Sequence, residues 1–123
     1  MDALIITSAP NGAYKQAGDH AQVPLTSEQI ALTAKACLGA GASMLHLHIR
    51  DAQGRLSLDV NGYRSALDAV IKAVGQELVL QITSEAAKVY QAPAQIAMVR
   101  ELRPIGCAAR ATTRPESSRL RLR

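Results

Sequence analysis

Aromatic residues are almost absent from this chain. It contains neither phenylalanine nor tryptophan, and three tyrosines make up its aromatic content. Proteins that bind single-stranded nucleic acids stack bases on aromatic side chains, so this scarcity argues against such a partner. Cysteine is also rare: Cys37 and Cys107 are far apart and fit no CxxC motif. We expect both to be reduced thiols with no role in a disulfide framework.

Long hydrophobic runs are missing as well. No stretch approaches the roughly 18 apolar residues of a membrane-spanning helix. The N-terminus lacks the basic segment and following apolar segment of a secretory signal. The 123 residues are 48% hydrophobic and 20% charged, which is the balance of one soluble globular domain. We therefore expect a cytoplasmic protein with no membrane partner.

The positive net charge is confined to the C-terminal end of the chain. Residues 1–103 carry nine basic and nine acidic side chains, whereas residues 104–123 carry five arginines and one glutamate. The body is therefore neutral, and the net charge does not identify a ligand of the folded part. An alternative function is a tail that binds nucleic acid or another polyanion. The absence of aromatic partners and of a helical charge stripe makes nucleic acid an unfavoured partner.

Residues 1–103 alternate short apolar runs with helical periodicity, which is the pattern of βα units. The runs at residues 4–8, 43–49 and 78–83 are predicted strands. Right-handed crossovers would place these strands side by side and parallel, with the helices on the outer face. Three helices are predicted: one capped by Thr26 and ended by Gly39, one capped by Asp59 and ended by Gly75, and one from Pro93 to Pro104.

The alternation stops at Pro104. A fourth strand is due there, but residues 105–123 have no sustained apolar period, so we expect none. We assign residues 104–123 to an irregular, basic and disordered tail, separate from the body at residues 1–103. The abrupt loss of pattern suggests a reading-frame artefact of a GC-rich gene or a spliced end, with further βα units in the parent protein.

The second predicted strand contains a pair of histidines, His46 and His48. Side chains alternate along a strand, so both imidazoles should lie on the face opposite Leu45 and Leu47. Their Cα atoms would be about 6.5 Å apart, a span that two imidazoles can close onto one ion at about 2.1 Å from each nitrogen. A divalent metal, zinc first, is the expected ligand. The alternative is a pair of hydrogen-bonded core histidines.

Other polar residues follow the first and third strands. Hydroxyl and amide groups at strand ends can hold a substrate carboxylate or carbonyl oxygen. The alternative is that these residues form turns and helix caps. The long polar loop at residues 10–24 favours a functional role for the same rim. The candidates are Asn11, Gly12, Thr83, Ser84 and Glu85.

A set of short motifs runs through residues 1–104. In chain order they are Asn11-Gly12-Ala13, Pro24-Leu25-Thr26, Gly41-Ala42-Ser43, His46-Leu47-His48-Ile49-Arg50-Asp51 with Gly54 close behind, and Gln81-Ile82-Thr83. In order and spacing they resemble the β-keto acid cleavage enzymes, a family known for the cleavage of 3-keto-5-aminohexanoate in lysine fermentation. The resemblance implies an α/β fold, the N-terminal portion, about three βα units, of a TIM-type (β/α)8 barrel.

The resemblance also implies an activity and a set of site residues. These enzymes are zinc-dependent and exchange acyl groups between a β-keto acid and acetyl-CoA, which gives acetoacetate and a new CoA thioester. Carried over, His46 and His48 would be metal ligands, beside a glutamate from a late strand. Thr83 would hydrogen-bond the substrate, with Ser84 as a weaker candidate, and Asn11 and Gly12 would line the pocket. A homo-oligomer of the family type is a further expectation.

Two residues depart from the family pattern. Members that accept the amino substrate have a glutamate for its ammonium group where this chain has Tyr14, and many members have glycine where it has Glu85. Both would line the substrate pocket, so the resemblance implies another β-keto acid. A full barrel needs about 250 residues, so we expect weak zinc affinity and little activity from this chain alone. Metal-dependent hydrolases, which also use an HxH strand but commonly on the first strand, are the rival enzyme class.

Overall fold

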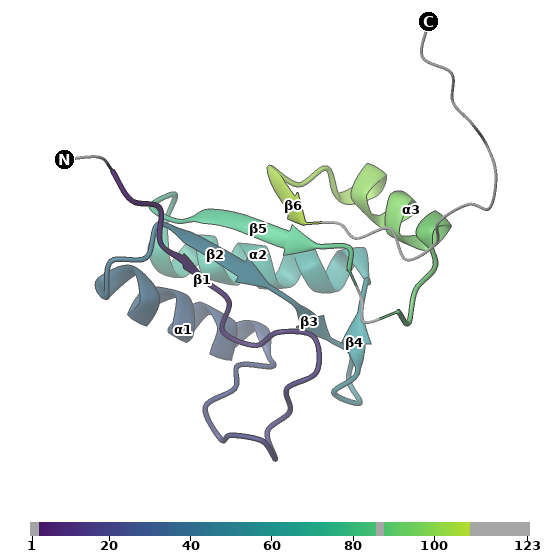
Figure 1. The fold of residues 1–123 in the computed structure, drawn as a ribbon, viewed down its shortest axis with the longest axis horizontal. Helices are drawn as coiled ribbons and strands as arrows, with labels where there is room; N and C mark the ends of the chain where they lie inside the picture. Colours follow the sequence, from purple (N-terminus) through teal and green to yellow (C-terminus); the bar gives the residue numbers. More distant parts are fainter. Residues whose placement is uncertain (1–2, 86–87, 109–123) are drawn as a thin grey trace, which may run out of the picture.

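In the computed structural model, residues 3–85 and 88–108 are described, and they form an α/β fold with a four-stranded parallel sheet (Figure 1). The strand order is β1-β2-β5-β6, and a separate antiparallel pair, β3-β4, follows β2. The elements are β1 (Thr7–Ser8), α1 (Ser27–Gly39), β2 (Met44–Leu47), β3 (Ile49–Arg50), β4 (Leu56–Ser57), α2 (Val60–Val74), β5 (Val79–Thr83), α3 (Ala92–Leu102) and β6 (Gly106–Ala108).

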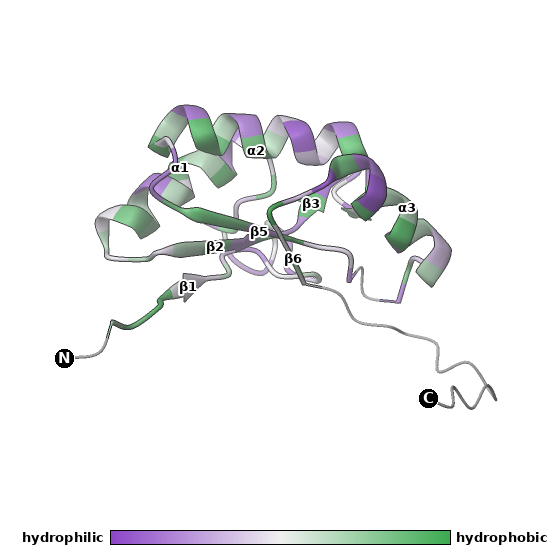
Figure 2. Ribbon diagram, turned by 90° about the horizontal axis from the view of Figure 1, so that it is seen from above, coloured by the Kyte–Doolittle hydropathy of each residue, from purple (hydrophilic) through white to green (hydrophobic). Residues whose placement is uncertain are grey.

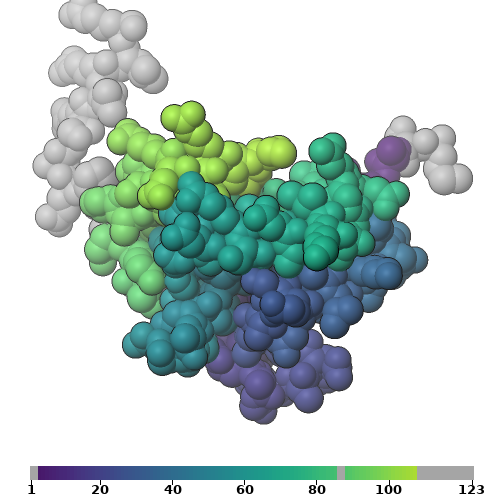
Figure 3. Space-filling view, turned by 180° about the vertical axis from the view of Figure 1, so that it is seen from behind, coloured from purple at the N-terminus to yellow at the C-terminus, as the bar shows by residue number. Residues whose placement is uncertain are grey.

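All three of these helices lie on one face of the sheet (Figure 2). Seen from that side, the side chains of α1, α2 and α3 cover the strands (Figure 3). Leu45 and Leu47 of β2 point into this layer and are fully buried, together with Ile82 of β5. The opposite face, here called the open face, carries the alternate residues of β2 and β5. These residues are Met44, His46, Val79 and Gln81.

The predicted helices are confirmed, and local hydrogen bonds explain where they begin. The Thr26 hydroxyl accepts a hydrogen bond from the backbone N–H of Gln29 at 3.2 Å, while the Gln29 side chain accepts from the backbone N–H of Thr26 at 3.1 Å. This reciprocal capping box begins α1. The Asp59 carboxylate caps α2 through the Gly62 amide. Pro93 lies in the first turn of α3. The backbone N–H groups of a first turn have no partner within the helix, so the N–H that proline lacks is not missed there.

The strand predicted at residues 43–49 is not continuous. β2 ends at Leu47, and β3 begins at Ile49 and pairs antiparallel with β4, a strand that the periodicity did not predict. The strand is interrupted because the backbone N–H and C=O of His48 both form hydrogen bonds with the Asn11 side chain and not with a neighbouring strand. The first predicted strand is also shorter than expected, since β1 holds only Thr7–Ser8 and the apolar residues before it are exposed.

The prediction that no strand follows Pro104 is wrong. β6 pairs parallel with β5, with Gly106 beside Gln81 and Cys107 beside Ile82. A strand of three residues is too short to show an alternation of apolar and polar residues. Its pairing with β5 uses backbone N–H and C=O groups, which the sequence does not distinguish from those of a loop. A side chain at Gly106 would come within 3.3 Å of the Leu80 carbonyl oxygen, so glycine suits this close approach. The rest of the predicted tail, residues 109–123, lies outside the described residues.

None of the helices in the described part of the chain combines the length and apolar character needed to cross a bilayer.

Tyr63 connects α2 to the carboxyl end of β5. Its side chain is fully buried, and its hydroxyl donates a hydrogen bond to the Thr83 carbonyl oxygen at 2.8 Å. Burial raises the pKa of Tyr63, so the phenol stays protonated and remains a donor.

We predict that Tyr63→Phe lowers the free energy of unfolding by about 1 to 3 kcal/mol, because the Thr83 carbonyl loses its buried donor. Urea denaturation followed by circular dichroism would measure the change. Tyr14→Phe is the matched control, since Tyr14 is 73% exposed and its variant should stay within about 0.5 kcal/mol of the wild type. Equal midpoints for the two variants would contradict the prediction.

Candidate functional site

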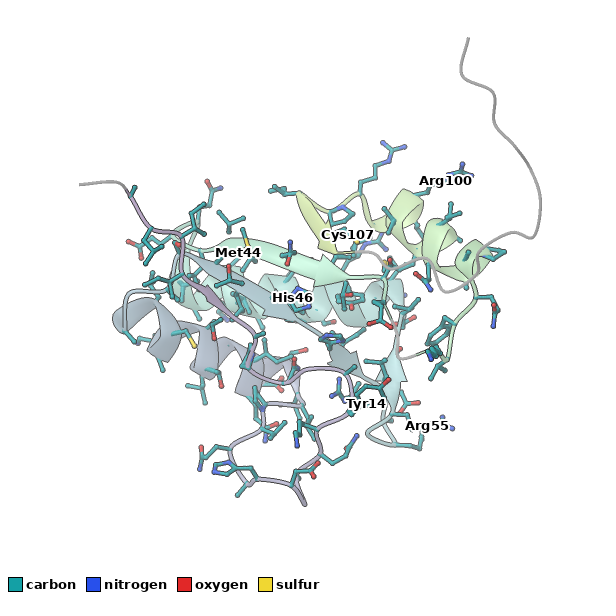
Figure 4. The ribbon with its side chains drawn as sticks, viewed as in Figure 1. Tyr14, Met44, His46, Arg55, Arg100 and Cys107 are labelled. Atoms are coloured by element: carbon teal, nitrogen blue, oxygen red, sulfur yellow. The ribbon has the colours of Figure 1, made fainter. Side chains whose placement is uncertain are left out.

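The two histidines lie close together, with His46 on the open face and His48 directly after the end of β2. Their ring centroids are 5.3 Å apart, and the rings meet edge to face at an interplanar angle of 77°. Figure 4 shows His46 in front of the sheet, on the side away from the helices. The two imidazoles are therefore close enough to act on one ligand.

His46 has a hydrogen-bond partner on the neighbouring strand. Its Nδ1 atom lies 2.8 Å from Oε1 of Gln81, and the two residues are paired in the register of β2 and β5. An amide oxygen can only accept a hydrogen bond, so Nδ1 of His46 is the donor. Sequence reasoning did not single out Gln81 as a site residue. The signal was present, because Gln81 is the one strongly polar side chain in the apolar run at residues 78–83.

His48 is more deeply placed than His46. Its side chain is 6% exposed, and burial, with the nearby His46 and Arg50, lowers the pKa of His48 to about 4. The imidazole is therefore neutral at pH 7 and keeps a nitrogen lone pair. Its Nδ1 atom is buried and has no hydrogen-bond partner among the described residues. A buried, unpaired nitrogen is costly unless something binds it.

Asn11 holds the loop after β1 against the end of β2. Its Nδ2 atom donates to the carbonyl oxygens of His48 at 2.7 Å and Pro24 at 3.0 Å. Its Oδ1 atom accepts from the backbone N–H of His48 at 3.2 Å. These three hydrogen bonds hold the buried Asn11 amide against the end of β2. Its predicted place in the lining of a substrate pocket stays a prediction.

Arg50 joins the same loop to β3. Its Nη2 atom donates to the carbonyl oxygens of Gly12 at 2.8 Å and Lys15 at 3.2 Å. Gly12 has a φ of 54°, a left-handed conformation that favours glycine. Burial lowers the pKa of Arg50, yet a guanidinium remains charged at neutral pH. Gly12 therefore allows the left-handed turn of the loop, and its carbonyl oxygen binds Arg50. The charged guanidinium of Arg50 lies near His48.

Thr83, the last residue of β5, and Ser84, which follows it, point to opposite faces. Thr83 is two residues beyond Gln81, so it shares the histidine side of the strand, and its hydroxyl accepts from the Glu85 amide at 3.0 Å. Ser84 points the other way and donates to Gln95 of α3 at 3.2 Å. The structure thus places Thr83 on the same side of β5 as Gln81, the partner of His46, and Ser84 against α3.

The remaining predicted residues lie at the edges of this site. Glu85 is partly buried beside Thr83, and Tyr14 is 73% exposed on the loop after β1 (Figure 4). Their roles in substrate binding stay predictions.

The histidine pair was predicted to bind a metal, and its geometry can be compared with what such a site needs. Within the described residues, no group of three or more His, Cys, Asp or Glu side chains could hold a metal ion. Zinc sites use at least three protein ligands, commonly neutral imidazoles and carboxylates. The neutral His48 and the Nδ1-donating His46 fit two of those positions. Zinc binding by this pair would need a further ligand, which the described residues do not place beside it.

Comparison with known proteins gives a consistent result. Residues 3–115 match the family described as beta-keto acid cleavage enzyme. The 3-keto-5-aminohexanoate cleavage enzyme of Fusobacterium nucleatum is 39% identical over 70 residues, which are 57% of this chain and 26% of that enzyme. The enzyme of the same name from Acetoanaerobium sticklandii is 34% identical over 86 residues, 70% of this chain and 32% of that enzyme.

A third relative is named for a different activity. The 3-dehydrocarnitine:acetyl-CoA trimethylamine transferase of Rhizobium meliloti is 33% identical over 82 residues, which are 66% of this chain and 27% of that protein. The matched part of the chain thus spans between 26% and 32% of the length of the three relatives described.

We predict that Asn11→Ala lowers the free energy of unfolding by roughly 3 kcal/mol, because it leaves the N–H and C=O of His48 and the carbonyl of Pro24 without their partner. Urea denaturation would measure the loss, and hydrogen exchange of the His48 amide should become faster. Asn61→Ala, at an exposed position of α2, is the matched control. An unchanged exchange rate at His48 would show that the Asn11 amide does not hold this backbone.

Proposed function

Since this chain belongs to the beta-keto acid cleavage enzyme family, we propose that it contributes His46 and His48 as metal ligands to an enzyme that cleaves a β-keto acid with acetyl-CoA. The products would be acetoacetate and a new CoA thioester. One observation carries the proposal: the family match includes His46 and His48, whose ring centroids lie 5.3 Å apart at the end of β2. The same match favours this class over the metal-dependent hydrolases that an HxH strand leaves open.

The proposed frame is the beginning of a (β/α)8 barrel. The strands of the sheet are parallel and follow chain order, and the helices cover one face only. Right-handed βα units added at the β6 edge would continue this arrangement, and the open face would become the inner wall. Active sites of such barrels lie at the carboxyl ends of the strands, which is where His48, Thr83 and the loop after β1 lie.

Zinc is the proposed metal. His46 and His48 would hold it, with a glutamate of the family type, from beyond the described residues, as third ligand. Bound zinc would act as a Lewis acid that polarises the carbonyl oxygens of the keto acid. Burial keeps the His48 imidazole neutral, and neutral imidazole is the form that binds a metal.

The other residues of the site would position the substrate. Thr83 lies on the histidine side of β5, where its hydroxyl can hydrogen-bond a keto acid oxygen beside the metal. Arg50 and Asn11 hold the loop that carries Gly12 and Tyr14 against the strand ends. A neutral phenol at position 14 cannot neutralise an ammonium group, so we propose a β-keto acid other than 3-keto-5-aminohexanoate as the substrate.

We predict that His46→Ala and His48→Ala each weaken zinc binding by the metal-free chain at least tenfold, because each removes one ligand. Competition with a chromophoric chelator would measure the affinity. His20→Ala is the matched control, since it removes the third histidine of the chain from an exposed position in the loop after β1. Equal zinc affinity in all three variants would refute the assignment of the pair.

We also predict that the 123-residue chain alone turns over β-keto acids and acetyl-CoA at a small fraction of the rate of a full-length family enzyme. Among the described residues, the two histidines leave a catalytic zinc site one protein ligand short. A coupled assay of CoA thioester formation with a panel of β-keto acids would measure the rate. Turnover comparable to that of the full-length enzyme would show that the described residues already contain a complete site.

A further inference from the structure

Gln81 is placed to control the protonation pattern of His46. The two side chains come from neighbouring strands, in register, and meet at 2.8 Å between Gln81 Oε1 and His46 Nδ1. We propose that Gln81 is a positioning residue that fixes the neutral His46 imidazole in the tautomer with its proton on Nδ1 and its lone pair on Nε2. The role in metal binding rests on the proposed function, whereas the control of the proton does not.

The chemistry of the two groups dictates the direction of this effect. A neutral imidazole carries one N–H, and an amide oxygen only accepts hydrogen bonds. With Oε1 of Gln81 facing the ring, as in this structure, the bond needs the proton on Nδ1 and leaves Nε2 as the free base. A metal ion binds through a lone pair, so this tautomer presents Nε2 as the ligand atom. A histidine without such a partner tends to carry its proton on Nε2, which would block that atom.

The backbone makes the contact rigid. β2 and β5 are paired over four residues, from Met44–Val79 to Leu47–Ile82, and the two polar side chains stand in the middle of this ladder. Their neighbours on the other face, Leu45 and Ile82, are fully buried against the helices. Two central strands thus hold the pair, and groups held by regular elements are more precisely placed than groups on loops.

A merely structural role for Gln81 makes a different prediction. A polar side chain on the open face could serve only to keep that face hydrated, and its replacement would then change stability or solubility. It would leave the ring proton of His46 where it is. The position of that proton is therefore the measurement that separates the two roles.

The test is nitrogen NMR on the whole chain with 15N-labelled histidine and a chelator present. Long-range proton–nitrogen couplings, recorded above the titration midpoint of each ring, report which nitrogen carries the proton. In the wild type we expect His46 to be protonated on Nδ1. In Gln81→Met the proton should move toward Nε2. Gln81→Glu, which restores an acceptor, should return it to Nδ1. Gln76→Met changes an exposed glutamine before β5 and should leave His46 as in the wild type.

Zinc affinity is the second readout. Loss of a side chain that orients a metal-binding histidine commonly costs 10- to 100-fold in affinity, and we expect a loss of about that size for Gln81→Met but not for Gln76→Met.

Two outcomes would overturn the proposal: a wild-type His46 that already carries its proton on Nε2, or a Gln81→Met variant that keeps it on Nδ1. If Gln81→Met does not fold, the spectra of the wild type and of Gln81→Glu still show which nitrogen of His46 carries the proton. A tautomer that shifts as expected, in a chain that binds no zinc, would support the positioning role of Gln81. It would at the same time contradict the proposed metal function.

Discussion

Parallel pairing of β2 with β5 is the constraint on which the other features of this structure depend. The register sets Leu45 and Leu47 beside Leu80 and Ile82, and these side chains form the layer that α1 and α2 bury. The same register leaves every second residue on the open face, which brings His46 next to Gln81. Core and candidate site are therefore two sides of one ladder, and a shift of one residue would exchange them.

The loop after β1 is held by hydrogen bonds to backbone atoms. Asn11 satisfies both polar groups of His48 where β2 ends, and Arg50 reaches back to the carbonyls of Gly12 and Lys15. These contacts replace the ladder bonds that a continuous strand would have made at His48. They let the chain leave the sheet at that point, turn through β3 and β4, and still hold the long loop at the rim of the site. A site on such a rim combines a rigid floor with loop residues that can differ among relatives.

The chemistry of the site follows from burial and from facing direction. Burial keeps His48 neutral, and the amide of Gln81 determines which nitrogen of His46 donates, so both rings are in forms that suit a metal. Ser84, one residue beyond Thr83, instead bonds to Gln95 of α3. The family relationship covers residues 3–115, and the two imidazoles lie within that match.

The sequence by itself determined the βα alternation, the three helices, the caps of α1 and α2, and the closeness of His46 and His48. These features depend on periodicity and on hydrogen bonds between near neighbours, which a sequence displays directly. Only the tertiary structure decided that β2 ends before His48, that β6 adds to the sheet, and that Gln81 bonds to His46. Each of these depends on groups more than twenty residues apart in the chain, such as Asn11 with His48 or Gln81 with Gly106. The physical reason is that backbone groups and single polar side chains leave no repeating pattern in the sequence. Their hydrogen-bond partners are therefore determined only when the strands pack together.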